Sequence, residues 1–423
     1  MIGFLGLSHL GLVSAAAAAA KGFDVVGFDG DAAHVERLGR GELPVVEPGL
    51  PELLAEVAGR LRLTADASKL AACDLLYVAV DVPTAPDDTS DPEPVARLVA
   101  LAAEVAAPGA VVVVLSQVEP GFTRTHRDAV ERDGRTLCYQ VETLIFGRAV
   151  ERALEPERFI VGCADPDAPL PAALKEHLAA FGCPVLPMRY ESAELCKIAI
   201  NAFLVSTIST TNTLAELCER IGADWGEIAP ALRLDRRIGP YAYLAPGLGI
   251  GGSNLSRDLA TIDRLARATG ADAGLVGTWR THALHRTDWP LALLHERVLA
   301  SVDEPRVALW GLSYKENTQS TRNSPGLRLA RTLADAEIEV AAYDPEAEPV
   351  TIDSPTFTRV ALPLDACAGA DALVVATPWP AFANPEEVAH ALRGRLVVDP
   401  YGVLDGGACR AAGLEHVRLG APC

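Results

Sequence analysis

Short apolar runs alternate with helical stretches along the first part of the chain. Residues 1–7, MIGFLGL, have the length and content of a buried strand, and an alanine-rich helix is expected after them to about Lys21. Similar apolar runs recur at 24–28, 75–80, 110–115 and 159–163. Strands that alternate with helices in this way predict a parallel, doubly wound sheet.

The pattern changes at Glu191. Residues 191–220 contain neither Gly nor Pro and place apolar residues at helical spacing, which predicts one long helix. Such a helix can divide two domains and can offer a surface for a dimer. Helical spacing continues to about Leu299, interrupted by the Gly-rich segment PGLGIGGSN at 246–254.

The strand–helix pattern restarts at Arg306 with RVALWGLSYK. A helix near 326–336 and strands within 339–345, 372–376 and 396–399 are expected. We therefore predict an α/β protein in which two Rossmann-like, doubly wound domains are joined by a central long-helix domain. The expected domains are 1–190, 191–299 and 300–423.

Composition narrows the range of partners. The chain has 423 residues, 49% of them apolar, and a formal charge of -19. This length predicts two or three domains with ample core. A surface this acidic repels phosphate backbones and anionic lipids, so neither nucleic acid nor a membrane is expected as a partner. Small anionic ligands stay open, because local cations and helix N-termini hold them.

The cysteines and the N-terminus bear on compartment. The nine cysteines show neither a CxxC pair nor zinc spacing with histidine, so we expect no metal and interpret them as small buried thiols. An unpatterned, odd set fits a reducing compartment. The start lacks the basic segment of a signal peptide, and no apolar run approaches the roughly 18 residues of a membrane span. We expect a cytoplasmic protein.

The turn GLSHLG after the first strand is a variant of GxGxxG. Gly6 makes the tight turn from strand to helix, Gly11 allows the helix to pack closely on the strand, and Ser8 is small enough not to block a ligand. His9 and Leu10 open the helix, whose free N–H groups and dipole favour a diphosphate. The turn predicts a dinucleotide site.

Asp29 selects the dinucleotide. It ends the second strand, where a carboxylate accepts both ribose hydroxyls and repels a 2′-phosphate, which favours NAD over NADP. A structural Gly turn followed by an incidental Asp is the alternative. Because the turn follows a strand, precedes a helix and is followed by this acid, we predict NAD.

Six segments, in the right order, resemble the nucleotide-sugar dehydrogenases typified by UDP-glucose and GDP-mannose dehydrogenases. The last of them is close to the family signature GxxxKxxTxDxRxSP, with Ser320 in place of Asp. The resemblance extends over almost the whole chain. The segments are VEPGL (46–50), DVPT (81–84), AELCKIAIN (193–201), RIG (237–239), GLGIGGS (247–253) and GLSYKENTQSTRNSP (311–325).

The resemblance implies a function. Members of this family have a cofactor domain, a central helical domain that dimerises and a C-terminal domain that binds the nucleotide diphosphate. They oxidise the C6 alcohol of the sugar twice, through an aldehyde and a cysteine thiohemiacetal, to a carboxylate, and consume two NAD. The resemblance therefore implies a nucleotide-sugar substrate, with uridine as the commonest base, and a homodimer.

The resemblance also implies catalytic residues. Lys197 and Asn201 are four residues apart and so share one helix face, where they can steady an alkoxide or an ordered water. Taken by themselves, they are better interpreted as a solvated Lys and an incidental Asn. The resemblance matches them, together with Asp258, to the catalytic Lys, Asn and Asp of the family. Glu142 matches the Glu of its PEFL segment.

Further positions are implied to bind ligands. Arg237 matches an Arg that reaches the substrate of a neighbouring subunit. For the charged positions, a plain surface charge is the alternative. The cofactor positions are Val82, Pro83, Thr84, Gln117 and Arg322, beside those of the turn and Asp29. The substrate positions are Glu142, Lys197, Asn201, Arg237, Gly249, Gly251, Gly252 and Lys315.

Four departures from the family pattern affect the chemistry. Asn254 follows GGS where the family has its catalytic Cys, and an amide cannot form a thiohemiacetal. Phe146 takes the place of the second Glu of PEFLxEG, which serves hydrolysis. Gln117 stands where the family has Thr. Arg257 replaces a Lys beside Asp258, and it keeps the charge but does not readily give up a proton.

These losses are selective, because the cofactor turn persists. The main hypothesis is reversible two-electron hydride transfer between an alcohol carbon of a nucleotide-linked sugar and NAD. A redox-neutral variant oxidises the sugar, inverts or eliminates at the neighbouring carbon and returns the hydride. The alternatives are a conventional dehydrogenase that makes a uronic acid despite Asn254, and a non-catalytic NAD or nucleotide-sugar sensor.

Overall fold

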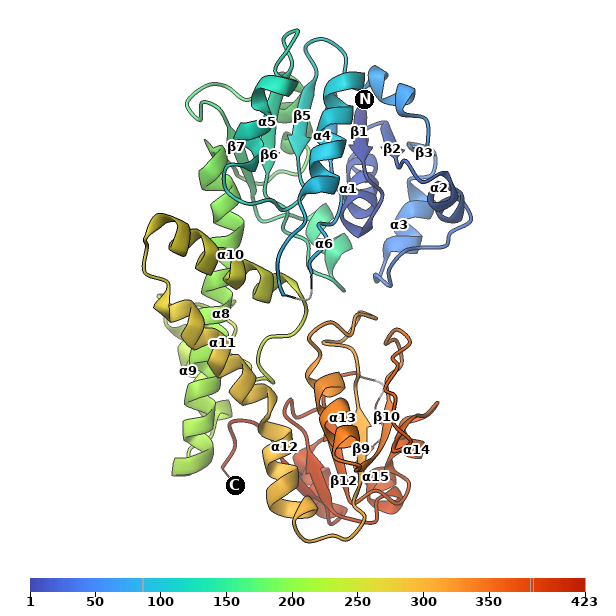
Figure 1. The fold of residues 1–423 in the computed structure, drawn as a ribbon, viewed down its shortest axis with the longest axis vertical. Helices are drawn as coiled ribbons and strands as arrows, with labels where there is room; N and C mark the ends of the chain where they lie inside the picture. Colours follow the sequence, from blue (N-terminus) through green and yellow to red (C-terminus); the bar gives the residue numbers. More distant parts are fainter. Residues whose placement is uncertain (86, 381, 383, 423) are drawn as a thin grey trace. The chain divides into compact units, whose positions relative to one another are not determined.

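The chain folds into two compact units, Met1–Ile200 and Asn201–Cys423, and each contains a sheet of its own (Figure 1). The structure is a computed structural model that describes residues 1–85, 87–380, 382 and 384–422. Both sheets have the doubly wound strand order that the alternation of strands and helices predicts. The α/β fold class is therefore confirmed.

The first unit contains an eight-stranded sheet. Its strands are β1 (Ile2–Leu5), β2 (Val25–Phe28), β3 (Leu61–Thr64), β4 (Leu75–Val78), β5 (Val111–Val114), β6 (Thr136–Gln140), β7 (Phe159–Cys163) and β8 (Val185–Arg189). Their order across the sheet is β3-β2-β1-β4-β5-β6-β7-β8. The order reverses between β1 and β4, and ligands of doubly wound sheets bind at such a point.

Helices cover both faces of this sheet. They are α1 (His9–Ala20), α2 (Ala32–Gly39), α3 (Leu50–Glu56), α4 (Glu93–Val105), α5 (Phe122–Val130), α6 (Ala149–Leu154) and α7 (Ala172–Ala179), with a 3-10 turn at Ala67–Ala72. Ala15–Ala19 of α1 are at most 2% exposed. Their small side chains let α1 lie close to the sheet, so this alanine run is a core helix.

The sequence predicted five of these strands and missed three. The five apolar runs are strands β1, β2, β4, β5 and β7, because each is buried along its length. Strands β3 and β8 show no continuous apolar run, because most of their residues are at least partly exposed. The sheet is parallel, as predicted, except between β6 and β7, which run antiparallel and pair Tyr139 with Gly162.

Five further helices precede the second sheet. They are α8 (Tyr190–Ile221), which crosses from the first unit into the second, α9 (Trp225–Leu234), α10 (Asn254–Thr269), α11 (Gly274–Thr287) and α12 (Trp289–Leu294), followed by a π-turn at His295–Leu299. The predicted long helix is thus confirmed within one or two residues. Val205, Leu259 and Val276 join α8, α10 and α11 in one small core.

Helix α8 carries more apolar side chains than its packing in the core buries. By length and composition it could cross a membrane, yet only 33% of its most apolar window is buried. A core helix of a soluble protein passes the same test, so this is weak evidence. After Asn201, exposed apolar side chains recur along α8 at helical spacing: Phe203, Leu214, Leu217 and Ile221. They lie on the face opposite to buried residues such as Val205.

The second sheet has six parallel strands in the order β11-β10-β9-β12-β13-β14. The strands are β9 (Arg306–Trp310), β10 (Glu339–Tyr343), β11 (Phe357–Arg359), β12 (Ala372–Val375), β13 (Leu396–Val398) and β14 (Glu415–Val417). Its helices are α13 (Pro325–Asp335), α14 (Pro363–Cys367), α15 (Pro385–Ala391) and α16 (Gly406–Ala411).

The two sheets repeat one local geometry at their first turn. Gly6 and Gly311 follow the first strand of each sheet with φ +97° and +106°. The carboxylate of Asp29 accepts the N–H of Leu7, and the carboxylate of Asp344 accepts that of Leu312. The second sheet is therefore a structural echo of the first, as expected from the restart at Arg306, although the turn after Gly311 is much longer.

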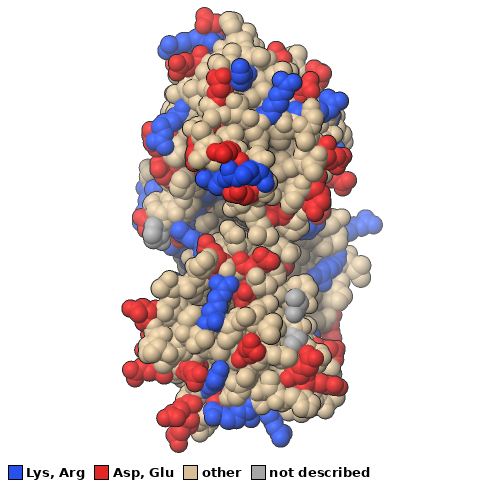
Figure 2. Space-filling view, turned by 90° about the vertical axis from the view of Figure 1, so that its right-hand side faces the viewer, with Lys and Arg blue, Asp and Glu red and all other residues tan. Residues whose placement is uncertain are grey.

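The surface mixes both signs of charge. Figure 2 shows Lys and Arg side chains interspersed with Asp and Glu over the face in view. Acidic residues outnumber basic ones by 56 to 37. Six of the cysteines are buried and two are partly buried, all as free thiols, and Cys423 lies outside the described residues. Among the described residues, no group of three potential metal ligands gathers.

Candidate active site

The Gly-rich turn of the first unit can be made only by glycine. A Cβ on Gly11 would lie 1.9 Å from the carbonyl oxygen of Gly6 and 2.6 Å from that of Ala79. Gly6 itself has a left-handed backbone conformation, which side chains rarely adopt. Helix α1 is thereby held directly against the backbone at the ends of β1 and β4.

Asp29 directly follows β2, and its carboxylate is held by backbone N–H groups. Its Oδ2 accepts the N–H of Leu7 at 3.0 Å and its Oδ1 accepts that of Asp31 at 3.0 Å, so the backbone fixes the carboxylate. The unused lone pairs can accept ribose hydroxyls. A cavity of about 210 Å³ begins here, lined by Gly6, Asp29, Gly30, Val80, Pro94, Arg97 and Leu98. These residues fit the adenosine half of NAD.

Sequence reasoning missed the α4 side of this cavity. Pro94, Arg97 and Leu98 belong to α4, and no motif marks them. The available signal was positional, because the helix after the fourth strand of a doubly wound sheet begins beside the switch point between β1 and β4.

An acidic side chain already occupies the N-terminus of α1. Ser8 Oγ accepts the N–H of Asp81 at 2.9 Å, and Asp81 Oδ2 accepts the N–H of Leu10 at 3.3 Å. The sequence instead predicts that the N–H of Leu10 is free to bind the cofactor diphosphate. Asp81 is the first residue of the DVPT segment, and the sequence did not predict a role for it. After it, Val82 packs partly buried against the core, and Thr84 forms a bridge with Ser90.

His9 is a buried member of a three-part cluster. Its Nε2 lies 3.0 Å from Glu47 Oε2, and its ring stacks on Phe146 with centroids 4.4 Å apart. Glu47 also accepts the N–H groups of Gly147 and Ala149 at 2.9 and 2.8 Å. Burial raises the pKa of Glu47, but these hydrogen bonds outweigh it and lower the pKa below its usual value. Glu47 therefore fixes the loop that carries Phe146.

Lys197 meets Glu142 within the first unit. Lys197 Nζ lies 3.1 Å from Glu142 Oε2, and the side chains are 11% and 15% exposed. Glu142 comes from the loop that follows β6, where it also accepts the N–H of Leu144. Two of the predicted catalytic residues thus form one largely buried ion pair.

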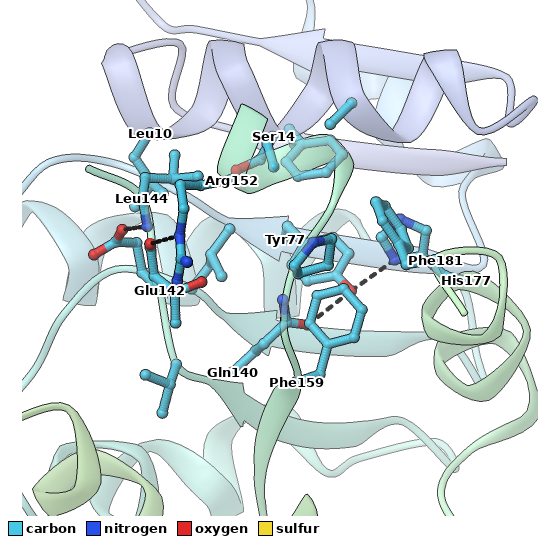
Figure 3. Close-up of a pocket in the computed structure, with 17 residues that line it drawn as sticks. Leu10, Ser14, Tyr77, Gln140, Glu142, Leu144, Arg152, Phe159, His177 and Phe181 are labelled. Atoms are coloured by element: carbon cyan, nitrogen blue, oxygen red, sulfur yellow. Dashed lines mark hydrogen bonds between the residues drawn. The ribbon is translucent and has the colours of Figure 1, made fainter. Parts of the chain in front are cut away.

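A small pocket extends behind Glu142, between α1 and the sheet. It has a volume of about 60 Å³, and Figure 3 shows Glu142 at one end and His177 at the other. Tyr77 Oη donates to Gln140 Oε1 at 3.2 Å and lies 2.9 Å from His177 Nδ1. Burial lowers the pKa of His177 to about 4. This end of the pocket is therefore neutral.

Asn201 meets Asp258 within the second unit. Asn201 Nδ2 donates to Asp258 Oδ2 at 2.5 Å, and Arg257 Nε donates to Asp258 Oδ1 at 3.3 Å. All three residues are at most 7% exposed. Asn201 and Lys197 lie one turn apart on α8. The helix thus carries an amide and an ammonium at the predicted spacing.

The Gly-rich loop of the second unit packs on an aromatic ring. A Cβ on Gly251 or Gly252 would lie 3.1 or 3.0 Å from the ring of Tyr314. The N–H of Gly252 donates to the carbonyl of Arg322 at 3.0 Å, and Lys315 Nζ lies 5.7 Å from the centre of the Tyr314 ring. The predicted substrate loop and the predicted Lys315 and Arg322 segment therefore adjoin.

Gly249 and Asn254 flank this packing. Gly249 is left-handed, with φ +83°, and a Cβ there would lie 2.4 Å from the carbonyl of Ala283. Asn254 is the first residue of α10 and is exposed. Its amide therefore lies at the surface of the loop.

Arg237 and Gln117 are the remaining predicted site residues. Arg237 is paired with Asp235 at 2.7 Å and its side chain is 88% exposed. Gln117 lies half-buried in the loop after β5. The role implied for each of these two residues stays a prediction.

The doubly wound sheet, the Gly-rich turn after its first strand and the carboxylate after its second strand are the features of the dinucleotide-binding domain of a dehydrogenase. The chain belongs to the UDP-glucose/GDP-mannose dehydrogenase family. Sequence models of the NAD binding domain, the central domain and the UDP binding domain of that family match residues 1–179, 191–282 and 308–406.

Relatives match along the whole chain. UDP-glucose 6-dehydrogenase AglM of Haloferax volcanii is 34% identical over 437 residues, which cover 99% of each chain. The structure of a UDP-glucose dehydrogenase from Pyrobaculum islandicum matches with a TM-score of 0.85 and 30% identity, over 100% of this chain and 98% of that one. A UDP-D-ManNAc dehydrogenase from Pyrococcus horikoshii matches with a TM-score of 0.83 and 26% identity, over 99% of each.

The protein is therefore an NAD-dependent oxidoreductase that acts on a CH–OH group and takes a nucleotide-sugar substrate. The predictions of NAD, of the enzyme class and of the family are confirmed. The relatives do not bear on the departures at Asn254 and Phe146.

Proposed function

We propose that the protein transfers one hydride between an alcohol carbon of a nucleotide-linked sugar, a UDP-hexose, and NAD, and that its chemistry stops before the acid. The reaction is either a single two-electron oxidation to the carbonyl compound or a redox-neutral oxidation and reduction, such as an epimerisation. The observation that carries this proposal is Asn254, which stands where a thiol must attack the aldehyde in full oxidation.

No thiol of the described residues offers a substitute. The sequence places Cys196 beside Lys197, but Cys196 packs against the core of the first sheet. The six buried cysteines and the partly buried Cys183 are not on the Gly-rich loop. Burial raises the pKa of Cys138 and Cys367 to about 12, so those thiols stay protonated.

Phe146 supports the same conclusion. A second carboxylate at this position is what the resemblance assigns to hydrolysis, and here an aromatic ring stacks on His9 instead. A ring cannot hold or deprotonate a water molecule. Hydrolysis of an acyl intermediate therefore lacks both the nucleophile that forms it and the group that activates water.

The first oxidation keeps its machinery. Bound NAD supplies the hydride acceptor. The alcohol carbon loses a hydride and its hydroxyl loses a proton, which leaves a carbonyl. Lys197, as the ammonium paired with Glu142, donates a hydrogen bond to the oxygen while negative charge develops on it. Glu142 accepts the hydroxyl proton, directly or through water.

Asn201 and Asp258 orient the second side of the oxygen. Asp258 accepts from the Asn201 amide and from Arg257, so its two oxygens are anchors for positioning. The Asn201 amide retains a second N–H for the substrate oxygen. We accordingly assign Asp258 to holding Asn201 in place, while Arg257 donates to its other oxygen.

A uridine diphosphate link is supported by the match of residues 308–406 to a UDP binding domain. Lys315, Arg322 and the loop glycines at 249, 251 and 252 bind the nucleotide and the sugar in this proposal. The proposal keeps the domain division at residues 190 and 299 and a cytoplasmic location. Val82, Pro83, Thr84, Gln117 and Arg322 complete the cofactor contacts.

A homodimer is part of the proposal. On α8, the apolar stripe of Phe203, Leu214, Leu217 and Ile221 is exposed by 39% to 77%. A stripe of this kind needs a cover of matching chemistry, and a second copy provides the same stripe. The exposed Arg237 then reaches the partner's substrate, which is the role implied by the resemblance.

One assay separates the proposal from its strongest competitor. The names of the relatives favour a conventional 6-dehydrogenase, which yields two NADH and a uronate per sugar. The proposed reaction yields one NADH and a carbonyl product, or none with exchange of solvent deuterium into the sugar. NADH and product mass across a panel of nucleotide sugars decide between them.

A further inference from the structure

Glu194 in the first turns of α8 is a buried carboxylate with two backbone partners. Its Oε2 accepts the N–H of Gly121 at 2.6 Å, and its Oε1 accepts the N–H of Thr123 at 2.8 Å. The residue is 0% exposed. Both N–H groups belong to the N-terminus of α5, so a side chain from another helix caps α5.

This cap has no substitute within α5. Gly121, the residue before the helix, carries no side chain that could accept the free N–H groups. A carboxylate is also the group that the positive end of a helix favours. Burial raises the pKa of Glu194, and the negative charge of Glu191 raises it further, which is the cost of placing a carboxylate here. The backbone N–H groups offset part of that cost.

The loop that Glu194 holds reaches the cofactor site. Residues 116–121 connect β5 to α5 and include Gln117. Ser116 Oγ accepts the N–H of Val80 at 2.9 Å and donates to its carbonyl at 2.7 Å. Val80 lines the cavity beside Asp29. A chain of hydrogen bonds and backbone therefore runs from α8 to the wall of the NAD pocket.

The same turns of α8 also hold the substrate side. Lys197 follows Glu194 by three residues and pairs with Glu142 from the loop after β6. Strands β5 and β6 are neighbours in the sheet. Glu194 and Lys197 thus tie one short stretch of α8 to the loops of two adjacent strands, one loop on the cofactor side and one on the substrate side.

We propose that Glu194 is a positioning residue that couples the cofactor loop 116–121 to the placement of Lys197 on α8. NAD that orders this loop favours the position of α8 in which Lys197 meets the reacting oxygen, and displacement of α8 loosens the NAD pocket in return. This inference rests on the proposed role of Lys197, and it assigns a function to a residue that contacts neither ligand.

Glu191 provides a matched control. It lies one turn before Glu194 on α8 and pairs with Arg124 of the same helix α5. Its side chain is 40% exposed and that of Arg124 is 45% exposed. Exposed ion pairs contribute little to stability. Glu191 and Glu194 therefore connect the same two helices, but only Glu194 connects to buried N–H groups at the loop.

The test compares Glu194→Gln with Glu191→Gln in the full-length protein. Gln fills the same space but can accept only one of the two N–H groups, which leaves one buried donor unpaired. For Glu194→Gln we expect the Kd for NAD to rise about tenfold and kcat to fall about tenfold. The Kd for UDP should change less than about twofold, because its site lies in another domain.

Glu191→Gln should leave all three constants within about twofold of the parent. If Glu194→Gln only lowers Tm while kcat and both Kd values stay unchanged, the residue is merely structural and the proposal is wrong. If the parent binds NAD but turns over no sugar, the proposed function fails, and the Kd for NAD still tests the coupling.

Hydrogen–deuterium exchange of the parent provides a second test, which holds even if Glu194→Gln does not fold. Addition of NAD should slow exchange of the amides of residues 116–123 and of the α8 amides 194–201 together. Protection of the loop with no change in α8 contradicts the proposal.

Discussion

The side-chain amide of Asn201 donates to the carboxylate of Asp258 at 2.5 Å, and both residues are buried. One turn earlier on the same helix, Lys197 is paired with Glu142. Helix α8 therefore presents a fixed amide and a fixed ammonium, each anchored by a carboxylate. This arrangement suits stabilisation of a developing alkoxide, and it involves no nucleophile.

Removal of the ammonium should abolish most turnover. We expect Lys197→Met to lower kcat by about 100- to 1000-fold, the loss typical of one oxyanion donor. The Kd for NAD should rise only through the coupling described above. Single-turnover measurement of NADH checks this, with Lys175→Met, on the surface of α7, as a control expected to resemble the parent. Normal turnover by Lys197→Met contradicts its assignment.

Loss of the anchor should be milder than loss of the donor. Asp258→Asn keeps the size of the side chain but removes its charge beside Arg257, so the Asn201 amide is no longer fixed by a carboxylate. We expect kcat to fall by about 10- to 100-fold, with an unchanged Kd for NAD. A greater loss than for Lys197→Met, together with a shifted pH profile, would instead make Asp258 a base.

The acid at the N-terminus of α1 should weaken cofactor binding. Asp81 places a carboxylate on the N–H of Leu10, where the diphosphate of NAD needs a donor. Asp81→Asn keeps the hydrogen bond to the N–H but removes the like charge. We expect the Kd for NAD to fall about three- to tenfold, most strongly at low ionic strength.

Asp87→Asn, in the same loop but farther from α1 in the sequence, is the control for Asp81→Asn. It should leave the Kd for NAD unchanged. Weaker binding by Asp81→Asn would mean that Asp81 supports the cofactor, and the proposed competition would be wrong. Calorimetric titration with NAD measures both variants.

Substitution of Asn254 and Phe146 by the residues of the family pattern should restore full oxidation only when both are changed. Asn254→Cys supplies a thiol, and Phe146→Glu supplies the carboxylate for hydrolysis and removes the ring that stacks on His9. We expect the double variant to release a second NADH and a uronate at a measurable rate. Each single variant should release less than about a tenth of that second NADH, because each half-step needs its own group. Mass spectrometry of the product checks this.

Acid should destabilise the first unit through His177. Its pKa in the folded protein is lowered to about 4 by burial, from 6.5. The unfolded chain binds the extra proton between these values, so stability is present above pH 6.5 and falls as pH falls towards 4. The loss approaches about 3 kcal/mol. Urea unfolding at pH 7 and pH 4.5 should show a smaller difference in His177→Gln than in the parent.

The architecture was largely predictable, because buried strands carry unbroken apolar runs and α1 and α8 carry clear helical patterns. Strands β3 and β8 were missed, since partly exposed strands look like loops when their partners are unknown. The antiparallel pair of β6 and β7 was also missed, because direction depends on where the connection crosses the sheet. No local pattern records that.

The site was predictable only in part. Gly6 and Gly11 could be found from the sequence because their backbone geometry requires glycine, and Asp29 could be found because it directly follows the second strand. The contact of Lys197 with Glu142 joins segments 55 positions apart, and only the resemblance pointed to both residues. Asp81, Glu47 and Glu194 were overlooked, since a lone acid in a sequence shows neither its burial nor the N–H groups it accepts.

The stoichiometry of NADH per sugar tests the central claim most directly. Purified protein, NAD and a UDP-hexose are incubated to completion, hydroxylamine traps any aldehyde, and the product is weighed by mass spectrometry. One NADH with a trapped carbonyl compound is the predicted result, and deuterium entry without net NADH identifies the redox-neutral form. Two NADH and a uronate per sugar would contradict the account.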